Sequence, residues 1–182
     1  MKIAVVCANG KAGQLIVKDL FELTTDDLKD FDVVVDAFGA WESEVLPQHS
    51  ASLKHLCDVL SGTEVRLLVV GGAGSLYVNP EHSAQVMDGP DFPEMFKPLA
   101  NAQGKALAEL RQRSDVKWTF VSPACDFQAD GARSGRYLLG GEELMLNARG
   151  ESIISYADYA IAMVDEATCG NHIRQRISVV RA

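Results

Sequence analysis

The 182-residue sequence has few of the features that mark membrane, secreted or zinc-binding proteins. It contains no run of 18 consecutive apolar residues, and an apolar pattern begins already at residue 3, without the basic segment and cleavage site of an export signal. Its four cysteines form no C-x-x-C pair, and its four histidines lack zinc-site spacing. We therefore expect a cytoplasmic protein with reduced thiols, outside the membrane and without a bound metal.

Positive charge is also scarce. Lys and Arg number 17 against 25 Asp and Glu, which gives a formal net charge of -8. Nucleic-acid binding needs clustered basic residues, so we expect no nucleic-acid partner and expect a small-molecule substrate, with a homodimer left open. No low-complexity tract or internal repeat divides the chain, and its length suits a single domain over residues 1–182.

The sequence does contain a regular alternation of strand and helix patterns. Short β-branched apolar runs, typical of buried parallel strands, occupy residues 2–7, 32–37, 66–70, 118–121 and 177–180. Segments with helical spacing separate them, at residues 12–18, 49–60, 98–113 and 156–166. The alternation predicts an α/β fold of the Rossmann type, a doubly wound parallel sheet with helices on both faces.

Two smaller elements complete the expected fold. Thr24 and Thr25 precede acidic residues in the manner of a capped short helix. Between residues 136 and 147, two apolar stretches flank Gly140 and Gly141, which predicts a small hairpin excursion from the sheet.

A glycine-rich turn follows the first predicted strand and leads directly into the first predicted helix. Gly10 and Gly13 there would let the backbone approach a pyrophosphate, whose charge the start of the helix stabilises. Cys7 stands where a full G-x-x-G-x-x-G turn has its first glycine, and a tight turn without ligand is the alternative. Lys11 either reaches a phosphate or remains solvated.

Six stretches that span nearly the whole chain share a family pattern. They are KIAVVCANGKAG at 2–13, DVVVDAFGAW at 32–41, RLLVVGGAGSLYV at 66–78, PDFPEMFKPLANAQGKAL at 90–107, WTFVSPACDF at 118–127 and ISYADYAIAMVDE at 154–166. Together they resemble the NAD(P)H-binding atypical short-chain dehydrogenases/reductases, especially bacterial proteins of the NADH-flavin reductase type. Biliverdin-IX-beta reductase and NmrA-like redox sensors resemble the chain more distantly.

The resemblance implies an NAD(P)H site at the ends of the strands, where open α/β sheets bind ligands. It assigns the pyrophosphate to Asn9, Gly10, Lys11, Ala12 and Gly13, and the nicotinamide-side ribose to Ala37, Phe38 and Gly39. It assigns the borders of the nicotinamide to Gly71, Gly72, Ser122 and Pro123. It assigns the adenine side to Asp19 and Leu20, and the substrate pocket to Trp41 and Ser75.

The catalytic pair of many short-chain dehydrogenases, Tyr-x-x-x-Lys, is incomplete in this sequence. Lys105 fits the lysine, or is a solvated helix residue, but Asn101 stands four residues earlier and cannot donate the proton. Reduction of a flavin or quinone needs no such tyrosine, because the cofactor carries the hydride chemistry. We therefore expect an NAD(P)H-dependent reductase that passes hydride to a planar acceptor such as a flavin. A non-catalytic NmrA-like dinucleotide sensor is the alternative.

A second departure from the family lies between Lys18 and Asp19. Relatives continue there with strands that carry the residues selecting for or against a 2'-phosphate, whereas about one βαβ unit, roughly 30 residues, is missing here. The missing unit is either a true deletion or a gap in the sequence. Asp32 and Asp36 fall about 20 residues after Gly13, but we interpret their strand as the later one beneath the nicotinamide.

Aromatic residues near the predicted strand ends suit a flat acceptor or ordinary core packing. They are Trp41, Phe92, Phe96, Phe127 and Tyr137, of which we favour Trp41 for the pocket. The Pro-, Asp- and Gly-rich residues 80–98 have the composition of a lid or substrate loop. Ser155 and Asp158 are expected to cap the last helix.

Overall fold

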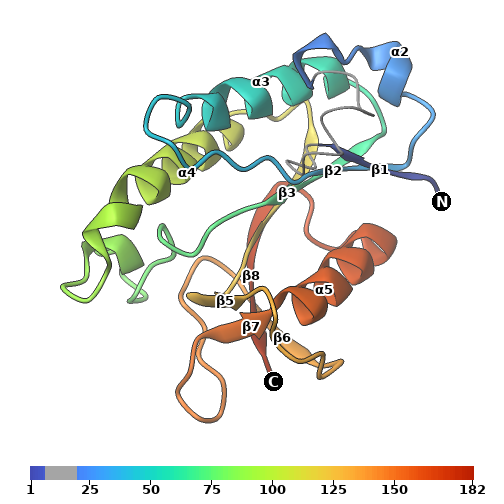
Figure 1. Ribbon diagram of the computed structural model, residues 1–182. Helices are drawn as coiled ribbons and strands as arrows, with labels where there is room; N and C mark the ends of the chain where they lie inside the picture. The colour runs from blue at the N-terminus through green and yellow to red at the C-terminus, as the bar shows by residue number, and fades with distance from the viewer. Residues whose placement is uncertain (7–19) are drawn as a thin grey trace.

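The computed structural model describes residues 1–6 and 20–182, which form three layers with the sheet in the middle (Figure 1). In this part of the chain the main sheet has six strands, in the order β1-β2-β3-β4-β8-β6. Five are parallel: β1 (Ile3–Val6), β2 (Val33–Asp36), β3 (Arg66–Val70), β4 (Lys117–Ser122) and β8 (Gln175–Arg181). The sixth, β6 (Tyr137–Gly140), is antiparallel to β8.

The register of the parallel strands brings their carboxyl ends to one edge of the sheet. Val35 lies beside Leu68, and Leu68 lies beside Thr119, so the central strands start and stop together. At the opposite side of the sheet from β6, β1 pairs with β2 alone among the described residues. Within β1, Ile3 is 36% exposed and Val5 is 62% exposed.

The longer helices divide between the two faces of the sheet. Figure 1 shows α3 (Gln48–Leu60) and α4 (Lys97–Leu110) together on one face and α5 (Tyr156–Cys169) on the other. The shorter helices are α2 (Thr25–Leu28) and the 3-10 helices η1 (Leu20–Glu22), η2 (Val86–Asp88) and η3 (Glu94–Phe96). No helix in residues 1–6 and 20–182 has the length and apolarity needed to cross a membrane.

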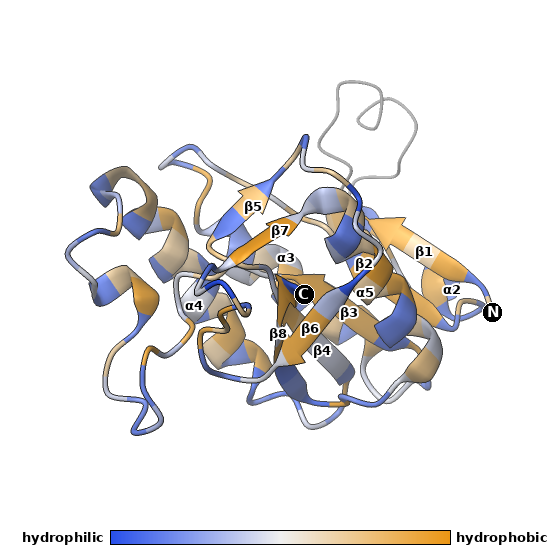
Figure 2. Ribbon diagram, turned by 90° about the horizontal axis from the view of Figure 1, so that it is seen from below, coloured by the Kyte–Doolittle hydropathy of each residue, from blue (hydrophilic) through white to orange (hydrophobic). Residues whose placement is uncertain are grey.

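Each face of the sheet has its own apolar core. Leu67 and Phe120 point into the core under α3 and α4, whereas Leu68 and Val121 point into the core under α5. This alternation along β3 and β4 explains their continuous apolar sequences, since a strand covered on both faces needs apolar side chains in both directions. Figure 2 shows the same apolar colouring along the central strands.

A second sheet of two parallel strands lies beside the end of β4. It consists of β5 (Asp126–Gln128) and β7 (Ile153–Ser155), and Asp126 pairs with Ile153. Residue Ser155 ends β7 and also begins α5, because its Oγ accepts a hydrogen bond from the Asp158 amide at 3.0 Å. Gly170 then ends α5 in the left-handed conformation, at φ 67°.

The structure confirms the Rossmann-type α/β architecture and the cap at Ser155. The predicted hairpin is wrong, because β6 pairs with β8 and not with the residues that follow Gly141. Glu143 instead bridges to Tyr77, and Tyr77 accepts the Leu144 amide at 2.8 Å. The apolar residues around Gly140 thus extend the main sheet. The helix predicted at 12–18 lies outside the described residues.

Candidate active site

A pocket of about 830 Å³ lies beyond the carboxyl ends of β2, β3 and β4. Three segments that directly follow these strands form its floor, and the side chains of α4, α5 and the loops around them form its walls. The lining residues are Ala37, Phe38, Gly39, Trp41, Val70, Gly71, Gly72, Ala73, Gly74, Phe92, Phe96, Leu99, Ala100, Gln103, Pro123, Ala124, Cys125, Asp126, Phe127, Tyr156 and Tyr159. Parallel strands that end together create such a crevice, which is where α/β sheets bind ligands.

The floor of the pocket consists of small residues for reasons of packing as well as access. A Cβ atom on Gly71 would lie 2.1 Å from the Phe120 ring, and one on Gly72 would lie 2.1 Å from Gln103 Oε1. Gly39 is different, since among the described residues a Cβ there would meet only Trp41 Nε1, at 3.6 Å. Gly71 is therefore required by packing against Phe120, whereas a Cβ on Gly72 would displace only the end of the Gln103 side chain. Gly39 keeps space open in the pocket.

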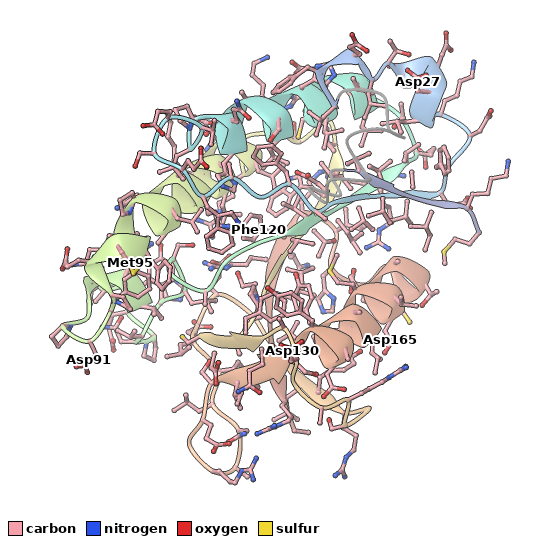
Figure 3. All side chains as sticks on the ribbon, viewed as in Figure 1. Asp27, Asp91, Met95, Phe120, Asp130 and Asp165 are labelled. Atoms are coloured by element: carbon pink, nitrogen blue, oxygen red, sulfur yellow. The ribbon has the colours of Figure 1, made fainter. Side chains whose placement is uncertain are left out.

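Aromatic side chains from separate elements line the walls. Trp41, 71% exposed, follows β2, while Phe92 and Phe96 come from the segment before α4. Across the pocket, the rings of Phe127 and Tyr156 have centroids 4.1 Å apart. Figure 3 labels Phe120 near the centre of the molecule, where it belongs to the core between the sheet and the helices α3 and α4. The walls offer flat apolar surfaces, which suit a planar ligand.

A buried arginine holds the loop of residues 71–75, which follows β3, from the core side. This loop is called the glycine-rich loop below. The side chain of Arg176, on β8, is 1% exposed. It donates to Ser75 O at 2.8 Å, Ser75 Oγ at 3.1 Å, Gly72 O at 3.3 Å and Ser122 Oγ at 2.9 Å. Burial lowers the pKa of Arg176 to about 10, so the guanidinium stays charged at neutral pH. Glu142 Oε2, 3.7 Å away, is its counter-ion.

The loop after β2 is fixed in a similar way by Asp36. This side chain is 3% exposed, and its Oδ1 accepts the Phe38 amide at 3.0 Å. Burial raises the pKa of Asp36 to about 6. His49, on α3, adds a contact because its Nε2 lies 3.0 Å from Ala40 O and its ring packs edge-on against Phe38. Both strand-end loops therefore have their backbone held from the core side.

The residues at the Tyr-x-x-x-Lys positions do not face the pocket. Asn101 is exposed and donates to Lys97 O at 2.9 Å, while Lys105 is 71% exposed, with its Nζ 3.8 Å from Glu109. Tyr159 lines the pocket, but its hydroxyl donates to Val121 O at 2.8 Å and burial raises its pKa strongly. Tyr159 is therefore held as a structural donor.

The structure brings some of the predicted site residues together and separates others. Predicted residues that line the pocket are Ala37, Phe38, Gly39, Trp41, Gly71, Gly72 and Pro123. Ser75 and Ser122 lie beneath the loop with Arg176, and Leu20 is buried in the core under α3. Tyr137 bonds to Asp165 outside the pocket lining. Asn9, Gly10, Lys11, Ala12, Gly13 and Asp19 lie outside the described residues.

Sequence reasoning missed several residues of this site. Gln103, Asp126 and Tyr156 line the pocket, and Arg176 supports it. Asp126 and Tyr156 carried a signal, since each follows a predicted strand or begins a predicted helix. Arg176 carried none, because its partners lie 54 and 101 residues away in the sequence. Within the described residues, no cluster of His, Cys, Asp and Glu is arranged to hold a metal ion.

Known proteins with similar sequences and structures cover this chain almost completely. The protein YwnB of Bacillus subtilis, which has no assigned function, is 39% identical over an alignment of 209 residues, covering 99% of this chain and 98% of YwnB. A crystal structure from Streptococcus pneumoniae, described as a "putative NADH-flavin reductase", is 47% identical with a TM-score of 0.93, and each chain is covered completely. A "putative exported protein" from Burkholderia pseudomallei is 33% identical with a TM-score of 0.83, covering 99% of both chains.

No profile of a known protein family matches the chain. The full-length similarity to the streptococcal and Bacillus proteins nevertheless exceeds what a shared fold alone requires. With its parallel sheet and its pocket at the strand ends, the chain belongs to the atypical short-chain dehydrogenase/reductase family that includes NADH-flavin reductase-like proteins.

Proposed function

We propose that this protein is an NAD(P)H-dependent reductase that passes hydride to a planar acceptor such as a flavin or quinone. The observation that carries the proposal is the pocket itself, whose floor is made of small strand-end residues and whose walls are aromatic. Its position at the ends of β2, β3 and β4 suits a nicotinamide ring, and the space between the walls suits a second flat ring stacked on it. The 47% identity to the streptococcal protein supports the same reading.

The proposed hydride transfer requires little from the side chains of the protein. A hydride leaves C4 of the reduced nicotinamide and bonds to the acceptor, which also takes one proton, so NAD(P)+ and the two-electron-reduced acceptor are formed. Lys105 and Asn101 do not face the pocket and the Tyr159 hydroxyl is engaged, so a Tyr-x-x-x-Lys pair does not supply the proton, and we propose water as its source. The protein then contributes orientation of two rings and exclusion of solvent from between them.

A spectrophotometric assay tests the proposal. Loss of NADH or NADPH absorbance is followed with riboflavin, FMN, FAD and quinones, and we expect turnover with at least one of them. Cofactor binding without oxidation by any acceptor would contradict the reductase and indicate the NmrA-like sensor. Absence of cofactor binding would contradict both.

A pair of glycine variants tests whether this pocket is the site. Gly39→Val fills part of the pocket, and its Cβ would lie 3.6 Å from the nearest described atom, Trp41 Nε1, so we expect at least a tenfold loss of kcat/KM. Gly141→Val is the matched control, because the nearest atom to a Cβ there is Glu143 Oε2 at 4.0 Å and Gly141 does not line the pocket. Equal activity of the two variants would place the reaction elsewhere.

We also propose a cytoplasmic location. Cys57, Cys125 and Cys169 are free thiols, and the last two are exposed, which fits a reducing compartment. The similarity to a "putative exported protein" makes the point worth testing. Cell fractionation with an antibody against the native protein should find it in the cytoplasmic fraction, and recovery outside the cell would contradict the proposal.

A further inference from the structure

We propose that the pocket selects uncharged planar acceptors, such as riboflavin or a simple quinone, over flavins that carry phosphate. The inference rests on the proposed reductase function and concerns only which acceptor is used. It follows from the charges and helix ends around the acceptor side of the pocket.

The lining of the pocket opposes an anion. Among its described residues Asp126 is the one charged side chain, and the described lining includes no Lys, Arg or His. Asp126 is exposed at the start of β5, where its carboxylate accepts a hydrogen bond from Gln128 Nε2 at 2.9 Å. Proteins bind phosphate with guanidinium and ammonium groups, and this wall presents a carboxylate in their place.

Three described cations on α4 and β8, namely Lys97, Lys105 and Arg176, have partners within the protein. On α4, Lys97 Nζ lies 2.5 Å from Glu94 Oε1, and Lys105 pairs with Glu109. Arg176 is buried beneath the glycine-rich loop, with its hydrogen bonds directed at that loop and at Ser122. These positive charges are either neutralised or enclosed, so they do not offset Asp126 at the pocket.

Internal hydrogen bonds occupy some of the amides at the helix starts beside the pocket. At the start of α4, the Phe96 amide donates to Pro93 O and the Lys97 amide to Glu94 O, while Pro98 has no amide hydrogen. At the start of α5, the Asp158 amide donates to Ser155 Oγ, and the Asp158 carboxylate lies in the first turn. A helix N-terminus binds anions through free amides, and at both of these helices part of the amide set is already engaged within the protein.

What remains for recognition is flat apolar surface. Trp41, Phe92 and Phe96 line the pocket, and so does the tilted ring pair of Phe127 and Tyr156. Such surfaces bind the ring system that all flavins and quinones share. The ring therefore supplies the affinity for every acceptor, and a phosphate group adds repulsion without adding a partner.

Steady-state kinetics with saturating NADH tests the proposal. We expect kcat/KM for riboflavin to exceed that for FMN by about fivefold at low ionic strength, because a dianion is repelled by Asp126. Menadione tests whether an uncharged quinone is accepted equally well. Added salt should raise kcat/KM for FMN and leave that for riboflavin unchanged, since the Debye length falls from about 30 Å at 0.01 M to about 10 Å at 0.1 M.

A charge-neutral variant assigns the effect to one side chain. Asp126→Asn should lower the riboflavin-to-FMN ratio of kcat/KM by about threefold. Asp130→Asn is the matched control, because Asp130 (labelled in Figure 3) is exposed four residues further on and is not part of the lining. The control should leave the ratio unchanged, although it changes the net charge of the protein by the same amount.

Two results would overturn the acceptor preference: equal kcat/KM for riboflavin and FMN, or an FMN preference that salt weakens. Quenching of flavin fluorescence on titration with protein and NAD+ measures the same preference without turnover. A protein that oxidises no cofactor but binds riboflavin more tightly than FMN would disprove the reductase and retain the selection against phosphate.

Discussion

The strand-end loops present different chemistry to the pocket and to the core. On the pocket side, Gly71 and Gly72 offer small, apolar surface, whereas on the core side the same loop is bound by the guanidinium of Arg176. The loop after β2 repeats the arrangement, with Phe38 facing the pocket and Asp36 holding its amide from below.

This difference explains how the pocket keeps a fixed shape. Polar groups that would restrict a ligand are absent from the described floor of the pocket and concentrated underneath it, where they order the backbone. A binding surface can then be apolar and still have a fixed shape, because its supporting shell is hydrogen-bonded. Single substitutions in this supporting layer test its role one contact at a time.

The largest effect is expected from Arg176→Met. The variant leaves Ser75 O and Ser122 Oγ without this buried donor, although Gly72 O keeps the Ser122 hydroxyl, so the free energy of unfolding should fall by about 3 kcal/mol. Urea denaturation measures the change. Arg149→Met is the control, because Arg149 is 65% exposed and its pair with Glu151 contributes at most about 0.5 kcal/mol. Similar losses in both variants would contradict a supporting role for Arg176.

Gly71→Ala should have the next largest effect. Its Cβ would lie 2.1 Å from the Phe120 ring, and overpacking of this kind costs about 2 to 3 kcal/mol of unfolding free energy. Gly141→Ala, with open space around its Cβ, should cost much less. If the ring is the cause, Phe120→Leu should cost less in the Gly71→Ala background than in the wild-type protein, and additive losses would show that it is not.

Asp36→Asn should change the dependence of stability on pH. Because burial raises the pKa of Asp36 from 3.8 to about 6, the folded protein binds this proton more tightly than the unfolded chain does. The resulting stabilisation is complete below pH 4 and is lost as the pH rises through 6. Asparagine cannot ionise, so the stability of the variant relative to wild type should rise by about 2 kcal/mol between pH 4 and pH 8.

Thermal or urea unfolding of both proteins at several pH values measures the Asp36 effect. Asp30→Asn provides the comparison, because it removes the same formal charge from an exposed position. A difference between Asp36→Asn and wild type that stays constant with pH would show that this carboxyl does not titrate in the interior.

Ser122→Ala should have the smallest effect. Its Oγ donates to Gly72 O and accepts from Arg176 Nε, both at 2.9 Å, and loss of the hydroxyl should cost about 1 kcal/mol. The exposed Ser114→Ala is the control. A cost as large as that of Arg176→Met would mean that the serine, and not the arginine, is the principal support of the loop.

The sequence predicted the fold well because the signals for it are local. The apolar run in β3 and the Ser155 cap of α5 depend on residues within a few positions of one another. The family resemblance led to Gly39, and the rule that ligands lie at strand ends led to Gly71, and both residues line the pocket.

The rest of the site depends on contacts between distant segments. Ser75 and Ser122 follow strands as expected, but they bind Arg176, a residue that no short motif connects with them. Lys105 has the right spacing on α4, yet its position around the helix exposes it to solvent. The strand around Gly140 found its partner in β8, about 40 residues later, and not in its neighbour. Short sequence patterns do not show contacts between distant residues or the side of a helix that faces solvent.

The position of β1 at the margin of the described sheet has a consequence for how such proteins diversify. The alignment with YwnB is 209 residues long against 182 residues here, so it includes positions at which this chain has no residue. Further strands added beside β1 would leave the pairing of β2, β3 and β4 untouched. Strands added there would therefore also leave the pocket at the ends of β2, β3 and β4 unchanged.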